Sequence, residues 1–88
     1  MNLKNVEEIR KLHAKEFPDD NDYYEFLMYQ IQSHMVEIND LKEHKDPHLQ
    51  SEIVDLAILS QLLTMQQKTS KDIFEKRYKR FKEKIKGK

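Results

Sequence analysis

Cysteine is absent from the 88 residues. The chain therefore has neither a disulfide framework nor a thiolate metal site, and nothing points to an oxidising compartment. No apolar run approaches the roughly 20 residues of a membrane-spanning helix, and the N-terminal sequence lacks the uninterrupted apolar region of a signal peptide. We therefore expect a soluble, cytoplasmic protein that does not enter a membrane.

Glycine and proline are also scarce, with one glycine and two prolines in a chain that is 36% charged. Such a composition, rich in Leu, Ile, Lys and Glu, is typical of helices and makes strands unexpected. It predicts an all-α fold of about four helices in a single domain, residues 1–88. A domain of this size buries only about two-thirds of the surface that its unfolded chain exposes, which favours self-association.

Turn signals and helical periodicity set the expected boundaries. The predicted helices are Asn5–Phe17, Asp22–Lys45, His48–Gln66 and a fourth from Thr69 or Ser70. Pro18 ends the first helix, Asp22 is the expected N-cap of the second, and Asp46 with Pro47 begins the third. The tail from about residue 82 is expected to fray.

Apolar side chains recur at helical spacing along three of these segments. The third segment is apolar nearly all round from Ile53 to Leu63, which predicts the central and most buried helix. The stripe of the second helix is expected to face the core, and the stripe of the fourth is expected to pack as well. The two stripes are Tyr24, Met28, Ile31, Met35, Ile38 and Leu41, and then Ile73, Phe74, Tyr78, Phe81 and Ile85.

Two pairs of potential metal ligands border this apolar surface. His34 and Glu37 lie three residues apart, as do Glu52 and Asp55, so each pair shares one face of its helix. Asp55 interrupts the apolar run of the third helix, and a carboxylate there must be paired, hydrogen-bonded, metal-bound or turned to a cleft. If the second and third helices form an antiparallel hairpin, the four side chains reach similar levels and can converge on one divalent ion. Oxygen-rich ligands of this kind select hard cations such as Mg²⁺.

The segments "SHMVEI" and "SEIVDL" resemble the two metal motifs of the MazG-type all-α nucleoside triphosphate pyrophosphohydrolases, Glu-Glu-x-x-Glu and Glu-x-x-Asp. The resemblance runs from about Tyr24 to Phe81, and phosphoribosyl-ATP pyrophosphohydrolase resembles the second half about as well. It implies a helical bundle completed by oligomerisation, as a homodimer or homotetramer, and cleavage of a nucleotide into a monophosphate and pyrophosphate.

The same resemblance implies roles for single residues. Glu37 and Glu52 would be catalytic, and His34, Glu37, Glu52 and Asp55 would hold Mg²⁺ or Mn²⁺. Basic residues of the fourth helix would hold the phosphates, and Tyr23, Tyr24 or Phe26 could line a base pocket. The phosphate-binding candidates are Lys76, Arg77, Lys79 and Arg80. Ser33 and His34 stand where the motif has two glutamates, and a neutral imidazole favours manganese, zinc or similar ions over magnesium.

Charge is distributed unevenly along the chain. Residues 68–88 hold ten Lys or Arg against three Asp or Glu, a net +7, so the first 67 residues carry −7. This asymmetry leaves a different class of function open, a helical nucleic-acid-binding or partner-binding protein that uses the basic helix. A further alternative keeps the MazG-like fold as a catalytically impaired nucleotide-binding or regulatory dimer. The remaining histidines, His13, His44 and His48, are expected to lie at the surface.

Overall fold

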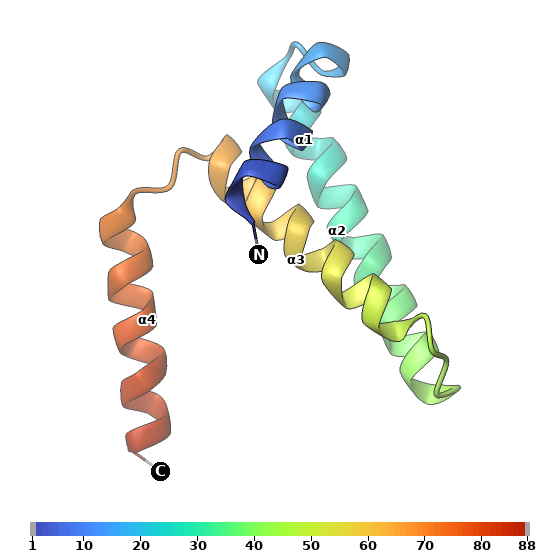
Figure 1. Ribbon diagram of the computed structural model, residues 1–88, viewed down its shortest axis with the longest axis vertical. Helices are drawn as coiled ribbons and strands as arrows, with labels where there is room; N and C mark the ends of the chain where they lie inside the picture. The colour runs from blue at the N-terminus through green and yellow to red at the C-terminus, as the bar shows by residue number, and fades with distance from the viewer. Residues whose placement is uncertain (1, 88) are drawn as a thin grey trace.

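The computed structural model describes residues 2–87 and consists of four helices in chain order (Figure 1). They are α1 (Leu3–Glu16), α2 (Asp20–Glu43), α3 (Leu49–Gln66) and α4 (Lys71–Lys86). No strand is present between residues 2 and 87, so the predicted all-α fold of about four helices is confirmed. Within the same residues, no helix combines the length and the apolar character that a membrane crossing requires.

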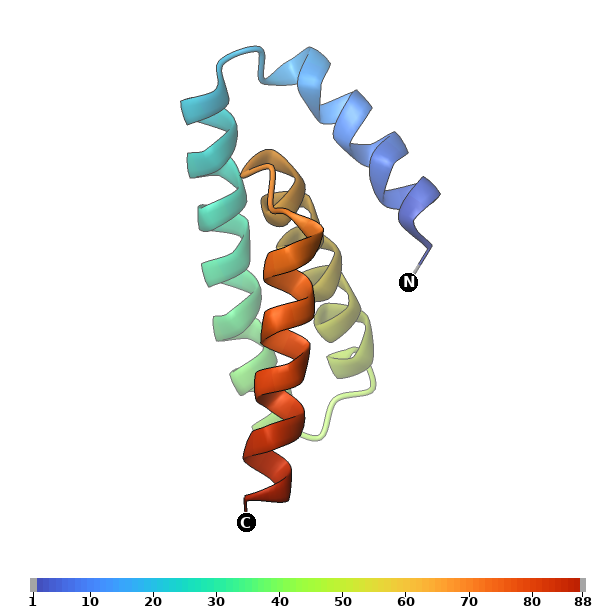
Figure 2. The same cartoon turned by 90° about the vertical axis from the view of Figure 1, so that its left-hand side faces the viewer.

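Helices α2 and α3 form an antiparallel hairpin, which is the most extensive helix–helix contact among the described residues. The axes of the two helices run side by side in Figures 1 and 2. The hairpin turn forms where the sequence predicts it. The backbone N–H of His48 donates to the Asp46 carboxylate at 2.8 Å, while the N–H of Asp46 donates to the Leu41 carbonyl at 3.0 Å. Lys45 adopts a left-handed φ of 53°, which reverses the chain direction. These contacts fix the register of α2 against α3.

The start of α2 differs from its prediction. Asp19, not Asp22, is the N-cap, because its side chain accepts hydrogen bonds from the backbone N–H groups of Asn21 and Asp22 at 2.9 and 3.0 Å. Asp22 therefore lies within the first helical turn. There its charge still interacts favourably with the positive end of the helix dipole.

The core lies at one end of the hairpin, where α1 crosses α3. Its buried side chains are Val6, Tyr23, Leu27 and Leu62. The predicted stripe of α2 is wrong at Tyr24 and Met35, which are exposed, and at the start of the helix Tyr23 and Leu27 are buried instead. The first half of α2 packs on the aromatic end of α1 as well as on α3, so the buried face is rotated by one residue toward α1.

The far half of the hairpin has no covering helix. We call residues 33–56 the bare half of the hairpin, because α1 packs beyond it and the core contains none of its side chains. Ile53 and Val54 are about half exposed there. The expectation that α3 is the most buried helix is therefore wrong for its first half, because only one layer of helix, α2, lies against it.

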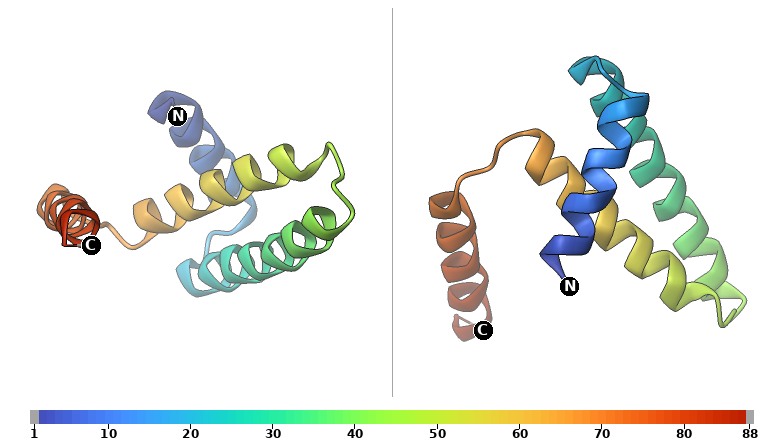
Figure 3. Two further views of the ribbon diagram at one scale, coloured as in Figure 1. Left: turned by 90° about the horizontal axis from the view of Figure 1, so that it is seen from below. Right: turned by 45° about the horizontal axis from the view of Figure 1, so that its top comes forward.

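Helix α4 stands apart from the other three, as Figures 1 and 3 show. Ser70, one of the two residues predicted to begin it, caps the helix by accepting from the N–H of Ile73 at 3.3 Å. The helix continues through Lys86, past the point near residue 82 where fraying was expected, and residue 88 lies outside the described residues. Its apolar stripe was expected to pack, but apart from the half-buried Phe74 it is 50–75% exposed. The four-residue connection 67–70 leads α4 away from its own hairpin.

Candidate metal centre

His34 is positioned on the face of α2 that looks toward α3. Its Nδ1 lies 2.7 Å from the backbone carbonyl of Gln30, one helical turn earlier. A carbonyl oxygen only accepts, so Nδ1 carries the hydrogen and the neutral ring presents the lone pair of Nε2. A carbonyl partner that fixes the tautomer in this way is the usual support of a metal-binding histidine.

The free nitrogen of His34 points at both carboxylates of the second predicted pair. Nε2 lies 3.4 Å from Oε2 of Glu52 and 3.6 Å from Oδ2 of Asp55. The ligand atoms of these three residues all lie within 4.8 Å of one another, and we call them the candidate metal cluster. The predicted antiparallel register therefore brings three of the four predicted ligands together.

Both distances from His34 are longer than a direct charged hydrogen bond and close to the spacing of two ligands of one ion. A charged N–H···O bond has a donor–acceptor distance of about 2.7–2.9 Å, shorter than both contacts. Two ligand atoms that each lie about 2.0–2.2 Å from one ion are themselves about 3.0–3.5 Å apart. One imidazole nitrogen with two or three carboxylates is a donor set that manganese, zinc and similar divalent ions accept.

Glu52 supplies the most unusual atom of the cluster. Its Oε2 is buried and has no hydrogen-bond partner among residues 2–87. A buried carboxylate oxygen without a donor is costly, since its hydration is lost and no protein group replaces it. A cation between His34 and Glu52 would supply that missing partner, so the residues fit a metal.

Glu37 lies beside the cluster rather than in it. Its neighbouring carboxyl group is the largest cause that raises the pKa of Glu52 above its usual 4.5. Burial and the negative charges of Glu37 and Asp55 raise this pKa further, while His34 opposes them.

The cluster also favours a proton on His34. The hydrogen bond to the Gln30 carbonyl is the largest cause that raises the pKa of His34 above 6.5, and the neighbouring carboxylates of Glu52, Asp55 and Glu37 raise it as well. Partial burial opposes them. A divalent cation would compete directly with these protons, because the ligands must be deprotonated to bind it.

An apolar cavity of about 270 Å³ opens beside the cluster. His34 and Asp55 form its polar edge, and Phe26, Ile58 and Leu59 are among its apolar walls. Small-molecule sites are usually apolar concavities with a few placed polar groups, and this one is close to the lower end of their size range. Of the three aromatic residues suggested for a base pocket, Phe26 lines this cavity, Tyr23 is in the core and Tyr24 is exposed.

The basic residues predicted to hold phosphate lie elsewhere. Lys76, Arg77, Lys79 and Arg80 are all exposed on α4, which has no extensive contact with the hairpin among the described residues. Lys76 pairs within its helix, with its Nζ 3.0 Å from Oδ2 of Asp72. Within one chain these four cations and the candidate metal cluster are therefore not neighbours.

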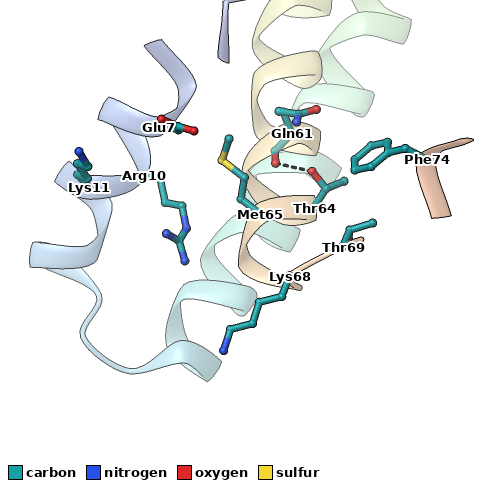
Figure 4. A pocket seen from close by; sticks show the side chains of 9 residues that line it. All are labelled: Glu7, Arg10, Lys11, Gln61, Thr64, Met65, Lys68, Thr69 and Phe74. Carbon is teal, nitrogen blue, oxygen red and sulfur yellow. Dashed lines mark hydrogen bonds between the residues drawn. The ribbon is translucent and has the colours of Figure 1, made fainter. Parts of the chain in front are cut away.

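A second concavity, of about 370 Å³, lies near the junction of α3 and α4 (Figure 4). Arg10, Lys11 and Lys68 surround it together with Glu7 and the Phe74 ring. It lies close to the core end of α3, about two turns or more beyond Asp55 along the helix. Sequence patterns did not suggest it, because its cations come from two segments far apart in the sequence, α1 and the connection 67–70.

One histidine is placed differently from its prediction. His13 is half-buried, and its Nδ1 lies 3.1 Å from the hydroxyl of Tyr23 in a cluster of rings that includes Phe17 and Phe26. Ile9 and Phe17, four residues before and after His13, place it on the apolar face of α1, a local signal that the prediction did not use. His44 and His48 are exposed, as predicted.

No protein-family model, curated protein or solved structure matches this chain. The candidate metal cluster is therefore interpreted from its own geometry.

Proposed function

We propose that the chain is a cytoplasmic, metal-dependent nucleotide pyrophosphohydrolase of the MazG-like type that works as a homo-oligomer. One observation carries the proposal: His34 holds Nδ1 on a backbone carbonyl and directs Nε2 at the carboxylates of Glu52 and Asp55. The apolar cavity beside His34 and Asp55 supports it, since a nucleobase or nucleoside needs such a surface near the phosphates.

Each residue would have a defined part in the reaction. His34, Glu52 and Asp55 would hold Mn²⁺ or Mg²⁺, which when bound neutralises phosphate charge and acidifies a coordinated water. Glu37 would stay outside the ligand set, where its carboxylate could accept a proton from the attacking water. Phe26 would pack against the base in the apolar cavity. Attack by this water would then break the P–O bond that joins the α and β phosphates and release a nucleoside monophosphate and pyrophosphate.

Calorimetric titration of the metal-free protein with Mn²⁺ and then Mg²⁺ tests the site. Saturable binding in the wild type should be lost, or weakened by at least tenfold, in Asp55→Asn and His34→Gln. Asp40→Asn is the matched control, because Asp40 is an exposed carboxylate on α2 that contacts only His44. Equal binding by Asp55→Asn and the wild type would refute the metal site.

Turnover needs a separate assay of pyrophosphate release from nucleoside triphosphates. Glu37→Gln should abolish release while metal binding persists, since Glu37 is proposed to move a proton and not to hold the ion. Metal and nucleotide binding without release in the wild type would favour the alternative, a nucleotide-binding or regulatory dimer. The loss of negative charge at Ser33 and His34 is the observation that favours this alternative.

A nucleic-acid-binding function is the second candidate, favoured by the exposure of the basic helix α4. It predicts DNA or RNA affinity that falls steeply as salt rises and that disappears when residues 71–88 are removed. Weak binding that is insensitive to this truncation would exclude it.

A further inference from the structure

We propose that α4 docks on the bare half of the hairpin of a second copy of this chain. Most of the apolar surface of α4 is left uncovered by residues 2–87: Tyr78, Phe81 and Ile85 are 57%, 63% and 75% exposed. With Phe74 they step by four, three and four residues, so they form one continuous stripe on the helix, which we call the docking face. An exposed apolar stripe of this length marks an interaction surface.

Charge identifies the partner surface. Residues 68–88 carry a net +7. Residues 20–66, the α2–α3 hairpin, hold nine Asp or Glu against Lys42 and Lys45, a net −7, whereas the first 19 residues are neutral. The positive charge of residues 68–88 in one copy therefore matches the negative charge of the hairpin in another copy. Electrostatic complementarity of this kind selects partners and speeds their encounter.

The bare half of the hairpin also offers apolar area. Met35, Val36, Ile53 and Val54 lie on it and are 48–70% exposed. Six of the nine hairpin carboxylates belong to this half, including those of the candidate metal cluster. A basic amphipathic helix is the element that such a mixed acidic and apolar surface complements.

The connection between α3 and α4 favours docking in trans. The N–H of Lys68 donates to the Met65 carbonyl, and that of Thr69 to the Thr64 carbonyl, both at 3.0 Å. Lys68 is held in a left-handed conformation with φ 54°. These contacts set the direction in which the chain leaves α3, and that direction carries α4 away from its own hairpin (Figure 3).

The contact is large enough for a weak but specific association. A 16-residue helix is about 24 Å long and about 10 Å wide. In a symmetric dimer α4 of each copy would dock on the other, and the two contacts together would bury about 1,000 Å². This is close to the lower limit of specific protein interfaces.

The assembly would bring a cation to each candidate metal cluster. Helix periodicity places Arg77 and Lys84 along one edge of the docking face, whereas Lys76, Lys79 and Arg80 point away from it. Arg77 of the second copy is therefore the phosphate-binding candidate that the dimer would bring to the site. This step rests on the proposed function; the docking itself does not.

Disulfide trapping tests the docking directly, since the chain has no cysteine of its own. Tyr78→Cys and Val54→Cys variants, mixed and oxidised, should form a covalent heterodimer. Leu12→Cys is the control, because Leu12 is as exposed as Tyr78 but lies on α1. Trapping that occurs only as Tyr78–Tyr78 pairs, or equally with the Leu12→Cys partner, would overturn the proposal.

Light scattering across about 1–500 µM protein supplies a second readout that needs no metal or substrate. The wild type should pass from monomer to dimer, with a Kd that rises with salt. Phe81→Asp should raise that Kd by at least tenfold while circular dichroism shows an unchanged helix content. A wild type that stays monomeric over this whole concentration range would overturn the docking. An intramolecular disulfide in a monomeric Tyr78→Cys/Val54→Cys double variant would show that α4 docks within its own chain instead. A failed metal titration with normal dimerisation would refute the proposed function alone.

Discussion

Replacing Leu62 by alanine should remove much of the stability of the domain. Leu62 is 1% exposed and is one of four buried core residues. Removing three carbons from a buried site costs about 2.4 kcal/mol, at roughly 0.8 kcal/mol for each methylene. The cavity that remains adds about 1 kcal/mol or more, so we expect a total of about 3–4 kcal/mol. A domain of this size has about 4–13 kcal/mol in all.

Urea unfolding followed by circular dichroism at constant protein concentration measures this loss. Leu12→Ala is the matched control, because Leu12 is 62% exposed on a helix and leucine and alanine have similar helix propensities. It should change the free energy of unfolding by less than about 0.5 kcal/mol. A loss below about 1 kcal/mol for Leu62→Ala, or equal losses for the two variants, would refute the position of the core at the α1 end of the hairpin.

Three further predictions concern the cap, the core phenol and the metal ligand. Asp19→Ala should cost about 1 kcal/mol of unfolding free energy and Asp22→Ala only a few tenths, and urea curves that rank them in reverse would refute the assigned N-cap. Burial raises the pKa of Tyr23 above 10.0, although Arg10 opposes this shift, so the stability that the phenol contributes is complete below pH 10 and is lost as the pH rises through the folded pKa. Tyr23→Phe should therefore lose less unfolding free energy than the wild type in an alkaline titration. An identical loss in the two proteins would refute the role of the Tyr23 phenol. His34→Glu restores a carboxylate to the cluster and should raise the affinity for Mg²⁺ relative to Mn²⁺ in calorimetry, and an unchanged ratio would indicate that His34 does not bind the ion.

The hairpin and the register of its ligand pairs could be predicted because both depend on local spacing. Residues three apart share a helix face wherever the helix packs, and the Asp46–Pro47 turn fixes how far each pair lies from the chain reversal. These two facts suffice to bring His34 to Glu52 and Asp55. Glu37 was expected in the same ligand set, but the cluster holds only His34, Glu52 and Asp55.

The buried face of α2 and the place of α4 depend on contacts between distant segments. Tyr23 rather than Tyr24 is buried because the aromatic end of α1 approaches α2 from one side, and periodicity alone does not distinguish the two neighbours. The stripe of α4 is equally apolar whether it packs on its own chain or on another molecule. Its exposure was therefore not predictable from Tyr78 and Phe81 themselves.

The location of the candidate metal cluster links its chemistry to stability. The core lies at the α1 end of the hairpin, so the bare half that carries His34, Glu52 and Asp55 has only one helix against another. A two-helix segment with a buried carboxylate oxygen that accepts no hydrogen bond from residues 2–87 is the part of the molecule that should open most readily. Both proposed ligands act there: a cation gives Oε2 of Glu52 a partner, and a second copy covers the apolar residues nearby. A ligand present at 100 times its Kd stabilises the folded state by about 2.7 kcal/mol, which is comparable to the loss expected for Leu62→Ala. Metal binding and dimerisation should therefore raise the stability of this half together, and each should tighten the other.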